Sequence, residues 1–467
     1  MSERSWSKQI PERDWDYIVI GSGMGGMTAA AFLAKLGKRV LVLEQHYTPG
    51  GYTHTFKRPG YEWDVGVHAV GEVTRHSMTG RLLHRLTDGR LQWTSLGEHY
   101  EEFYFPDDFR IEFPNHPAQF RKNLVEAFPD EEEAIDEYLL MVRQVAAAMK
   151  NHYLARLLPK GLGGFASKLF GSEAQEWLTK RTSDVVASLT DNPKLRAIFT
   201  AQWAYYGSTP SQSSFAMQAL VVKHFSHGGY YPIGGSSRIA EALLGTVAEA
   251  GGWTAIRTDV EEIVIEGGRA RGVRLKDGRT ISSKRVLSAA GVQSTVLRLL
   301  PKSHRQKEWA SSVESLRPSK AHVCLYLGFK GDIRSAGAGS ANQWFFEDWD
   351  MEKDLWHFQD EDSLAPCLYV SFGSLKNPDH DAGSEQRYSG EVITFVPYDA
   401  FAPWMDARWK KRGPEYDALK EQLTKRLLRQ FFTHRRDLEP LLDFAELSTP
   451  ASTEHFVRPV RGSIYGL

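Results

Sequence analysis

Cysteine is scarce in this chain of 467 residues, which contains only Cys324 and Cys367. The two cysteines lie far apart in short apolar runs and lack the spacing of metal ligands. Two such residues cannot build a disulfide framework, so the sequence predicts buried, reduced thiols in a cytoplasmic protein.

Long apolar runs and an excess of one charge are also missing. No segment approaches the roughly 20 apolar residues that cross a bilayer, and the polar stretch Met1–Asp14 lacks the apolar core of a signal peptide. The formal net charge is −1, so the chain offers no polybasic field to a phosphate backbone. We therefore expect neither a membrane-spanning segment nor a nucleic-acid partner.

Catalytic motifs of several enzyme classes are absent. His224 and His227 have no other ligand types beside them, so no metal site is predicted. The sequence has no G-x-S-x-G nucleophile elbow. Chemistry is therefore expected to come from a bound cofactor, with the protein orienting the substrate and excluding water.

A dinucleotide-binding motif is present near the start of the chain. The short apolar run Tyr17–Ile20 predicts a buried parallel strand. It leads into the turn Gly21-Ser22-Gly23-Met24-Gly25-Gly26, the helix-forming stretch Met27–Leu36 and a second predicted strand, Arg39–Leu43. This order is a βαβ unit with G-x-G-x-x-G at its strand-to-helix turn.

Each glycine of the motif has a predicted role at the cofactor. Gly21 makes the tight turn, Gly23 lets the backbone approach a pyrophosphate at the positive end of the helix, and Gly26 allows close packing. Glu44 stands 18 residues after Gly26, where a carboxylate accepts hydrogen bonds from ribose hydroxyls. A glycine-rich loop that binds nothing is the alternative, which the flanking elements disfavour.

The residues after Glu44 favour FAD over NAD. The pair Gly50-Gly51 lets the chain pass beside the diphosphate and ribityl region of a cofactor. The run Tyr17–Gly51 resembles the FAD fingerprint of the amine oxidase and phytoene desaturase superfamily. No second G-x-G-x-x-G occurs that would indicate a separate NADPH domain, so the sequence predicts one FAD site.

A second region of the sequence also has the pattern of an FAD-binding domain. Val260–Ile265, Ala270–Leu275 and Thr280-Ile281 predict a small antiparallel meander, and Arg285–Ala289 predicts a buried strand ending at Ala290-Gly291. In the superfamily that the chain resembles, such a meander joins the FAD domain, and the residue matching Val260 lies beside the adenine. The candidate cofactor-binding residues are Gly21, Ser22, Gly23, Met24, Gly25, Gly26, Glu44, Gln45, Gly50, Gly51, His54, Val260, Ala290 and Gly291.

Three groups of segments resemble a narrower branch of this superfamily, the retinol saturase and carotenoid isomerase branch of the phytoene desaturase family. The resemblance covers nearly the entire chain, and its most specific part is the run of glycines and tyrosines that begins at Gly229. The segments are Leu43–His46 with Gly50-Gly51, His54–Phe56 and Trp63–His68; Tyr206–Ser211 with Gly229–Ser237; and Ser448–Pro450 with Arg461–Gly466.

The resemblance implies an FAD-dependent oxidoreductase that saturates or desaturates a carbon–carbon double bond of a retinoid, carotenoid or other polyisoprenoid. Hydride would move between the substrate and flavin N5 while a proton is added or removed at the adjacent carbon. Cis–trans isomerisation on reduced flavin is the near alternative, and the Gly229–Ser237 match disfavours a flavin amine oxidase. His68 stands where the family's chain passes near the flavin and is the candidate catalytic residue, with a structural role as its alternative.

One departure from the family lies at the end of the sequence. The family continues past the part matching Tyr465-Gly466 into a strand and a helix whose N-terminus meets the isoalloxazine ring, whereas this sequence stops at Leu467. We therefore expect the C-terminal flavin segment to be missing. A catalytically incomplete flavin- or isoprenoid-binding protein accordingly stands as a third hypothesis.

The expected fold class is α/β. It comprises a Rossmann-like FAD-binding domain of the amine oxidase or phytoene desaturase type, from residues 1–110, 225–300 and 440–467, and an inserted mixed α+β substrate domain, from residues 111–224 and 301–439. Within the insertion, the apolar residues of Tyr153–Phe170 are interrupted by isolated Arg and Lys, a pattern that suits peripheral contact with a membrane holding a hydrophobic substrate. An ordinary core helix hairpin is the competing interpretation.

Overall fold

A five-stranded parallel sheet carries the glycine-rich motif. The structure, a computed structural model, describes residues 5–158 and 172–466. The strand order is β1-β10-β3-β2-β14, and the apolar strands β2 (Tyr17–Ile20) and β3 (Val40–Leu43) are almost wholly buried because both faces of the sheet are covered. The other strands are β1 (Trp6–Ser7), β10 (Trp253–Ala255) and β14 (Arg285–Ser288).

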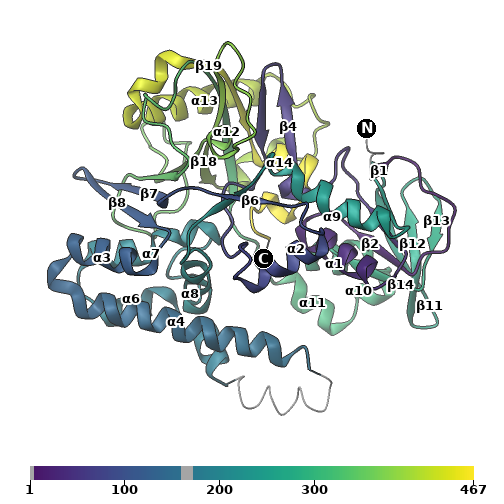
Figure 1. Cartoon of the computed structure of the whole chain (residues 1–467). Coiled ribbons are helices and arrows are strands. Elements are labelled where there is room, and N and C mark those ends of the chain that lie inside the picture. The colour runs from purple at the N-terminus through teal and green to yellow at the C-terminus, as the bar shows by residue number, and fades with distance from the viewer. Residues whose placement is uncertain (1–4, 159–171, 467) are drawn as a thin grey trace.

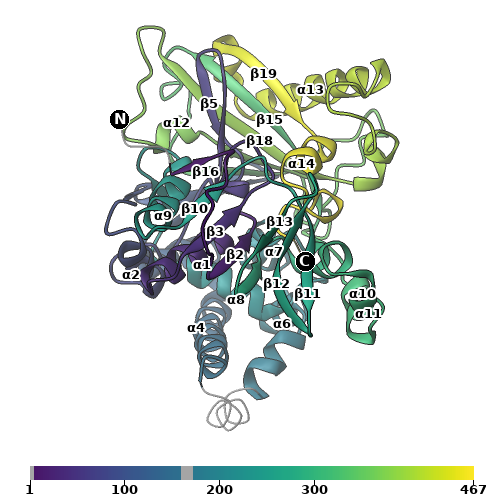
Figure 2. The ribbon, with the colours of Figure 1, turned by 90° about the vertical axis from the view of Figure 1, so that its right-hand side faces the viewer.

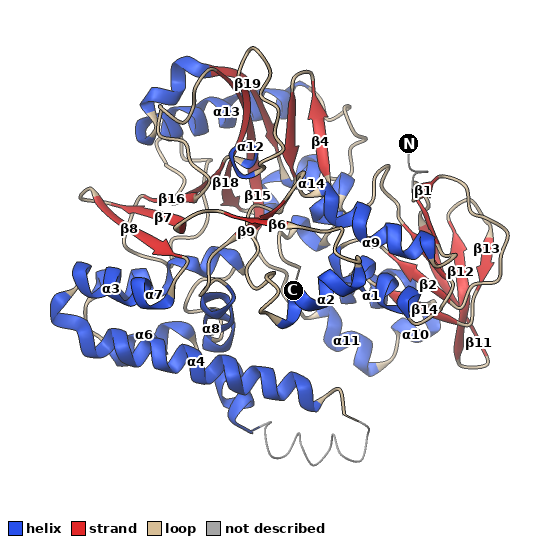
Figure 3. Ribbon diagram, in the orientation of Figure 1, coloured by secondary structure: helices blue, strands red, loops and turns tan. Residues whose placement is uncertain are grey.

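Different layers cover the two faces of this sheet (Figure 3). Side chains such as Val19 and Val42 pack against three helices, whereas their neighbours Ile18 and Leu41 pack against a three-stranded antiparallel sheet. The alternation follows from the two-residue period of a strand. The covering elements are α1 (Met24–Lys35), α2 (Met78–Leu86), α9 (Ser237–Glu249), β11 (Val260–Glu266), β12 (Arg269–Leu275) and β13 (Thr280–Ser282).

A seven-stranded mixed sheet forms the second body of the molecule. Its order is β19-β15-β18-β17-β16-β7-β8, and every neighbouring pair is antiparallel except β16 and β7. Cys324 and Cys367 lie on two of its strands as free thiols, and their predicted burial is confirmed. The strands are β7 (His99–Phe105), β8 (Phe109–Pro114), β15 (Ala321–Lys330), β16 (Asn342–Phe346), β17 (Cys367–Ser371), β18 (Arg387–Val396) and β19 (Leu442–Ser448).

The seven-stranded sheet separates two groups of helices (Figure 1). One face carries Trp344, Tyr369 and Phe395, which share a core with α4 and α8, while the opposite face, with Leu325 and Val370, packs on α13. The helices are α3 (Pro117–Ala127), α4 (Glu132–Ala155), α6 (Thr182–Leu189), α7 (Pro193–Thr200), α8 (Phe215–His224) and α13 (Pro414–His434).

Two short ladders connect the sheets. The hairpin of β4 (Thr55–Arg58) and β5 (Tyr61–Asp64) lies against β18 (Figure 2), and Trp63 Nε1 donates a hydrogen bond to the carbonyl of Leu327 at 2.8 Å. The second ladder pairs β6 (Trp93–Ser95) with β9 (Tyr230–Pro232). Further helices are α10 (Lys302–Arg305), α11 (Glu308–Glu314), α12 (Gly373–Lys376) and α14 (Pro450–Phe456).

The structure confirms the βαβ unit and the meander. The predicted first strand coincides with β2, and the three predicted meander strands correspond to β11, β12 and β13. Helix α1 begins at Met24, three residues before the predicted Met27, because the last two glycines of the motif already form its first turn. Because glycine has low helix propensity, the prediction from the sequence placed the start of this helix too late.

The strand pairing differs from the predicted domain boundaries at two places. Strand β7 falls within residues 1–110 and β19 within residues 440–467, yet β7 pairs with β16 and β19 pairs with β15 in the seven-stranded sheet. The apolar pattern of a sequence predicts a strand but does not indicate which sheet that strand joins. Backbone pairing therefore groups both strands with the second body.

The expected membrane-contact segment, Tyr153–Phe170, is described only up to residue 158, so Lys160, Lys168 and Phe170 lie outside the described residues. Within the described ranges, the structure contains no helix with the length and apolar character needed to cross a membrane.

We predict that Trp63→Ala destabilises the protein by about 3–5 kcal/mol, because it empties a site that is 1% exposed and removes the hydrogen bond to Leu327. Trp63→Phe keeps an aromatic ring and should cost less, about 1–2 kcal/mol. Urea unfolding of the cofactor-free protein measures both values, and equal stability of Trp63→Ala and the parent would contradict this account.

Candidate cofactor cleft and adjoining cavity

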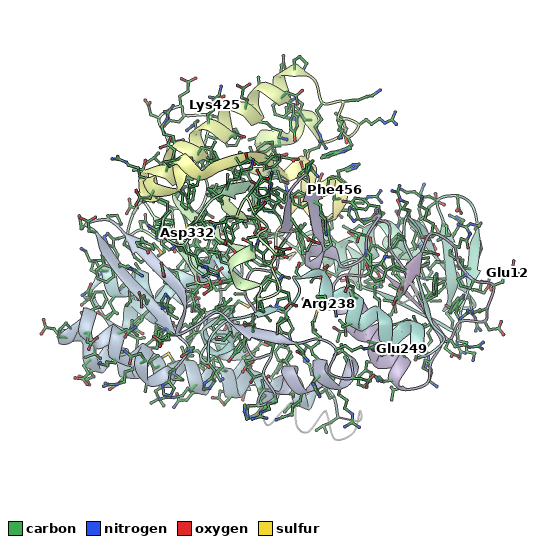
Figure 4. All side chains as sticks on the ribbon, turned by 45° about the horizontal axis from the view of Figure 1, so that its top comes forward. Glu12, Arg238, Glu249, Asp332, Lys425 and Phe456 are labelled. Carbon is green, nitrogen blue, oxygen red and sulfur yellow. The ribbon has the colours of Figure 1, made fainter. Side chains whose placement is uncertain are left out.

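A cleft of 640 Å³ opens at the carboxyl ends of β2, β3 and β14, the edge at which open parallel sheets bind ligands. Five separate parts of the chain line it, from the glycine-rich turn to the C-terminal segment after α14. Phe456, at the end of α14, lies where the two bodies meet (Figure 4). Tertiary folding therefore assembles a site that no single stretch of sequence contains.

Twelve of the fourteen predicted cofactor-binding residues line this cleft. The other two, Gly26 and Gly50, lie behind its wall. They hold the wall in shape, and the assignment of all fourteen to a cofactor stays a prediction. The twelve lining residues are Gly21, Ser22, Gly23, Met24, Gly25, Glu44, Gln45, Gly51, His54, Val260, Ala290 and Gly291.

Gly26 and Gly50 are required for close packing and for backbone conformation. A Cβ at Gly26 would lie 2.1 Å from the carbonyl oxygen of Gly21, so only glycine lets α1 pack this tightly on the turn. Gly50 has a φ of 125°, which side chains rarely permit, and its N–H donates to Ser22 Oγ at 3.1 Å.

The N-terminus of α1 points backbone N–H groups at the cleft. Gly23 is the N-cap residue and has no side chain with which to cap the helix. A Cβ built on Gly23 or Gly25 would meet no protein atom within 4 Å, so both positions face open space. Free N–H groups and the positive end of a helix dipole form an anion site, which fits the pyrophosphate of a dinucleotide.

Ser22 and Glu44 tie the glycine-rich turn to the end of β3. Glu44 Oε2 accepts hydrogen bonds from Ser22 N at 3.0 Å and Ser22 Oγ at 2.5 Å, and Oε1 accepts one from His46 N at 2.8 Å. Oε1 accepts only one of these hydrogen bonds and has a further lone pair, so Glu44 can still accept from a ribose hydroxyl. Glu44 thus fits the predicted role and also builds the site.

Neutral imidazoles line the cleft beside this turn. Burial and the neighbouring His54 lower the pKa of His46 to about 4, and burial also lowers the pKa of His54, whose Nδ1 lies 2.5 Å from the carbonyl of Gly51. Neither His46 nor the cationic residue Arg298, which complements an anionic cofactor, was predicted from the sequence to bind the cofactor. An arginine in a π-helical turn carries no recognisable motif in a single sequence.

A second cavity of 290 Å³ adjoins the cleft. Tyr52, Ile464 and Tyr465 belong to the walls of both spaces, and the Tyr52 hydroxyl donates to the carbonyl of Ser463 at 2.8 Å. Most of the cavity wall is aromatic or aliphatic, which suits a slender apolar ligand. The further lining residues are Val65, Gly66, His68, Ala69, Ala204, Tyr205, His322, Trp344, Cys367, Tyr369, Ile393, Thr394 and Phe395.

His68 lies in the wall of this cavity. Its Nδ1 is 2.8 Å from Oε2 of Glu391, a carboxylate on β18, and the two side chains are 10% and 2% exposed. His68 Nε2 has no hydrogen-bond partner among the described residues. Burial raises the pKa of Glu391, and the nearby imidazole opposes that rise.

The chain segments of the predicted family resemblance meet beside this cavity. Asp64, from the segment Trp63–His68, accepts hydrogen bonds from the hydroxyl of Tyr231 and from Ser236 N at 3.3 Å. Asn377 Oδ1 accepts from Gly234 N at 2.9 Å in the same turn. The run Gly229–Ser237 therefore has a structural task, which is to fasten α9 and its preceding turn to the chain that carries His68.

Four residues that lie at or behind the cavity wall were not predicted from the sequence: Glu391, Glu101, Lys376 and Tyr205. A partial signal existed for two of them, because Glu391 and Glu101 are charged residues in strands with several apolar or aromatic residues. A charged residue in such a strand is buried only together with a polar or oppositely charged partner. That partner is brought close by the tertiary fold, so its position cannot be read from spacing in the sequence.

One group of ligand-type side chains lies away from both spaces. His99, Glu102 and Glu112 approach within 4.8 Å of one another. Arg110 Nη2 lies 3.3 Å from Glu102 and 2.7 Å from Glu112, so a guanidinium already neutralises the carboxylates. We interpret the group as a salt-bridge cluster.

Comparison with known proteins identifies relatives along nearly the whole chain. Residues 19–86 match the family model of the NAD(P)-binding Rossmann-like domain. All-trans-retinol 13,14-reductase of Rattus norvegicus is 30% identical over 476 residues, which cover 98% of this chain and 78% of that protein. The chloroplastic prolycopene isomerase of Daucus carota is 23% identical and covers 97% of this chain and 72% of its own length.

Among solved structures, a redesigned putrescine oxidase superposes with a TM-score of 0.61 at 14% identity and covers 96% of this chain and 87% of its own. At that identity the likeness concerns the fold alone. It agrees with the expected amine oxidase type of α/β architecture.

We predict that Gly23→Val abolishes retention of a flavin while leaving the fold intact. Gly23 has a φ of −66° and a ψ of 174°, which valine adopts freely, and its Cβ would meet no protein atom, so only a bound pyrophosphate is obstructed. Flavin absorbance per protein after gel filtration measures retention. Gly339→Val is the matched control, because a Cβ there meets its first neighbour at 3.9 Å far from the cleft, and equal flavin content in all three proteins would refute the assignment.

Proposed function

Because this chain belongs to the family of the all-trans-retinol 13,14-reductases, we propose that it is an FAD-dependent oxidoreductase that reduces a carbon–carbon double bond of an isoprenoid. FAD would lie in the 640 Å³ cleft and the isoprenoid in the 290 Å³ cavity. When bound, the flavin supplies the hydride, and the protein supplies positioning, a dry environment and the proton.

The observation that carries the proposal is the common wall of the two spaces. Tyr52, Ile464 and Tyr465 border both, so a flavin held in the cleft and a polyene held in the cavity would be neighbours at these residues. Hydride transfer requires such contact between the reacting atoms. The aromatic and aliphatic cavity wall gives an apolar chain a place that water does not favour.

We propose that His68 delivers the proton to the substrate carbon. Its Nε2 lacks a protein partner in the described structure, and its Nδ1 faces the Glu391 carboxylate at 2.8 Å. A buried carboxylate at that distance fixes the orientation of the ring. The pair thus places a positioned imidazole beside an apolar ligand.

Cis–trans isomerisation is the second candidate, because a prolycopene isomerase is among the relatives. Isomerisation returns the substrate with no net gain of hydrogen, so it makes no lasting use of a proton donor. The His68–Glu391 pair therefore favours reduction over isomerisation. The two functions differ in the mass of the product.

The test of the function begins with the absorption spectrum of the purified protein after incubation with FAD. The proposal expects a bound flavin band, followed by loss of the reduced-flavin signal when a retinoid or carotenoid is added anaerobically to the pre-reduced protein. Mass spectrometry should then find a product two hydrogens heavier. A product of unchanged mass with altered geometry would support the isomerase, and a protein that binds FAD without any turnover would refute both enzymes.

We predict that His68→Gln lowers kcat by about 10²–10⁴-fold, the usual contribution of a positioned acid, while FAD retention is unchanged. Glu391→Gln should lower kcat less, because the imidazole stays in place but loses its stabilising charge. His322, which lies in the same wall with its pKa lowered to about 4 by burial, gives the matched control His322→Gln. Equal losses at His68 and His322 would show that the effect is one of packing.

We also propose a peripheral membrane contact at the C-terminal end of α4. Tyr153, Leu154, Leu157 and Leu158 are 53%, 40%, 80% and 46% exposed there, close together on one helix end. Exposed apolar side chains in such a group are costly in water and gain free energy in a lipid interface. An isoprenoid substrate held in that lipid would be within reach of the enzyme.

We predict that the protein floats with anionic liposomes in a density gradient, and that replacing Leu154 and Leu157 by Ser removes most of that binding. Added salt should weaken binding, since Arg156 contributes roughly 1 kcal/mol by attraction to the lipid charge. Leu364→Ser, at a residue 56% exposed elsewhere, is the control and should leave flotation unchanged. Unaltered flotation of the double variant would exclude this surface.

A further inference from the structure

Two opposite charges are buried behind the cavity and take no part in the proposed hydride or proton step. Glu101 on β7 is 0% exposed, and Lys376 at the end of α12 is 4% exposed. Burial of either charge alone would be strongly unfavourable. Both must therefore be compensated by other polar groups.

Glu101 is compensated by three hydrogen-bond donors. Asn342 Nδ2 donates to its Oε1 at 3.0 Å, the Tyr205 hydroxyl donates to the same oxygen, and Trp344 Nε1 donates to Oε2. Tyr205 and Trp344 belong to the wall of the 290 Å³ cavity. The carboxylate of Glu101 thus holds two side chains of the cavity from behind.

Lys376 is compensated by three acceptors. Its Nζ donates to the backbone carbonyl of His68 at 2.8 Å, to Ser371 Oγ at 2.7 Å and to Asn342 Oδ1. The first contact fixes the backbone of the proposed proton donor. The last contact is to the amide that also serves Glu101, so one asparagine connects the ammonium and the carboxylate.

We infer that Glu101 and Lys376 form a buried ion pair in which the Asn342 amide bridges the two charges, and that this pair positions His68 and Tyr205 on the cavity wall. The inference rests on the proposed function, because it gives the pair a task in the proton step. Glu101 and Lys376 are positioning residues, since neither lines the cavity. The ion pair fixes two parts of the wall that lie far apart in the sequence.

The charges of the pair exist together only near neutral pH. Burial raises the pKa of Glu101 to about 7, although its three donors and Lys376 oppose the rise, and burial lowers the pKa of Lys376 to about 8. Below this range the carboxyl is protonated, and above it the amine is neutral. The other titratable groups that face the pair are Tyr100, Tyr205, Tyr369 and Tyr465 around Glu101 and Asp64 and Glu391 around Lys376.

Glu102, the next residue along β7, shows how a different environment changes the pKa of a buried carboxyl group. Glu102 points to the opposite side, where His99, Tyr104 and Arg110 outweigh the effect of burial and lower its pKa to about 2. It therefore stays ionised at every physiological pH. Glu102→Gln is a matched control, because it removes a carboxylate from the same strand without touching the ion pair.

The pairing is tested first in the flavin-free protein, by NMR of lysine side chains labelled with ¹³C at Cε. The resonance that Lys376→Met removes should titrate near pH 8, and Glu101→Gln should move that midpoint lower, because a neighbouring negative charge is lost. Glu102→Gln should not move it. A midpoint near the ordinary lysine value, or one that Glu101→Gln leaves unchanged, would overturn the ion pair.

A second measurement of the pair avoids the lysine variant, which removes a buried charge and can impair folding. In the parent, the free energy of unfolding should fall as the pH rises from about 4.5 to 7. In this range the folded state still binds a proton at Glu101 that the unfolded state has released. Glu101→Gln should abolish that part of the pH dependence, and Glu102→Gln should retain it. The same pH dependence in Glu101→Gln and the parent would contradict the assigned burial of a titrating carboxyl.

The positioning role is tested by kinetics of the flavin-loaded protein. Glu101→Gln should lower kcat by about tenfold or more with little change in KM, and should move the alkaline limb of the pH profile below pH 8. An unchanged profile together with a shifted lysine titration would overturn the positioning role alone. If the parent and His68→Gln both fail to turn over, the proposed function fails, while the titration still decides whether the ion pair exists.

Discussion

The cofactor cleft depends on the hydroxyl of Ser22. This one group donates a hydrogen bond to Glu44 and accepts one from the N–H of Gly50, so it joins the turn after β2 to the turn after β3. Because the hydroxyl both donates and accepts, alanine at this position would release both turns. The open N-terminus of α1 is aimed into the cleft only while these turns keep their relative positions.

The local part of this arrangement follows from the sequence. The strand Tyr17–Ile20 and the six residues after it determine a βαβ turn by short-range sterics alone, since a Cβ at Gly26 would collide with the backbone of Gly21. The meander is equally local, because its strands are joined by tight glycine turns. These elements were predicted to within a few residues.

The cavity could not be predicted in the same way. Its wall combines residues from the loop after β5, from β15, β16, β17 and β18, and from the C-terminal segment, which only long-range pairing brings together. His68 was identified because a family resemblance marked it, whereas Glu391, 323 residues later in the chain, had no motif. The sequence likewise gave no reason to assign β7 and β19 to the seven-stranded sheet, because strand pairing is not encoded in composition.

Apolar and charged side chains lie in separate layers at the cavity. The side chains that touch the ligand space are mostly apolar, while the charges of Glu391, Glu101 and Lys376 lie one layer deeper and are held by hydrogen bonds. Such a layered arrangement gives an apolar ligand a dry surface and still places a proton within reach. It also makes the wall sensitive to changes in residues that never touch the ligand.

The contact between Tyr52 and Ser463 has a consequence for how the protein folds during its synthesis. These residues are 411 positions apart, and together with Phe456 they close a cleft that begins at Ile20. During synthesis the N-terminal βαβ unit emerges early, yet its binding surface stays incomplete until the segment after α14 has left the ribosome. We therefore expect cofactor capture to be a late event of folding, and a cell short of flavin to accumulate chains in which the segments around Tyr52 and Ser463 are less firmly held together.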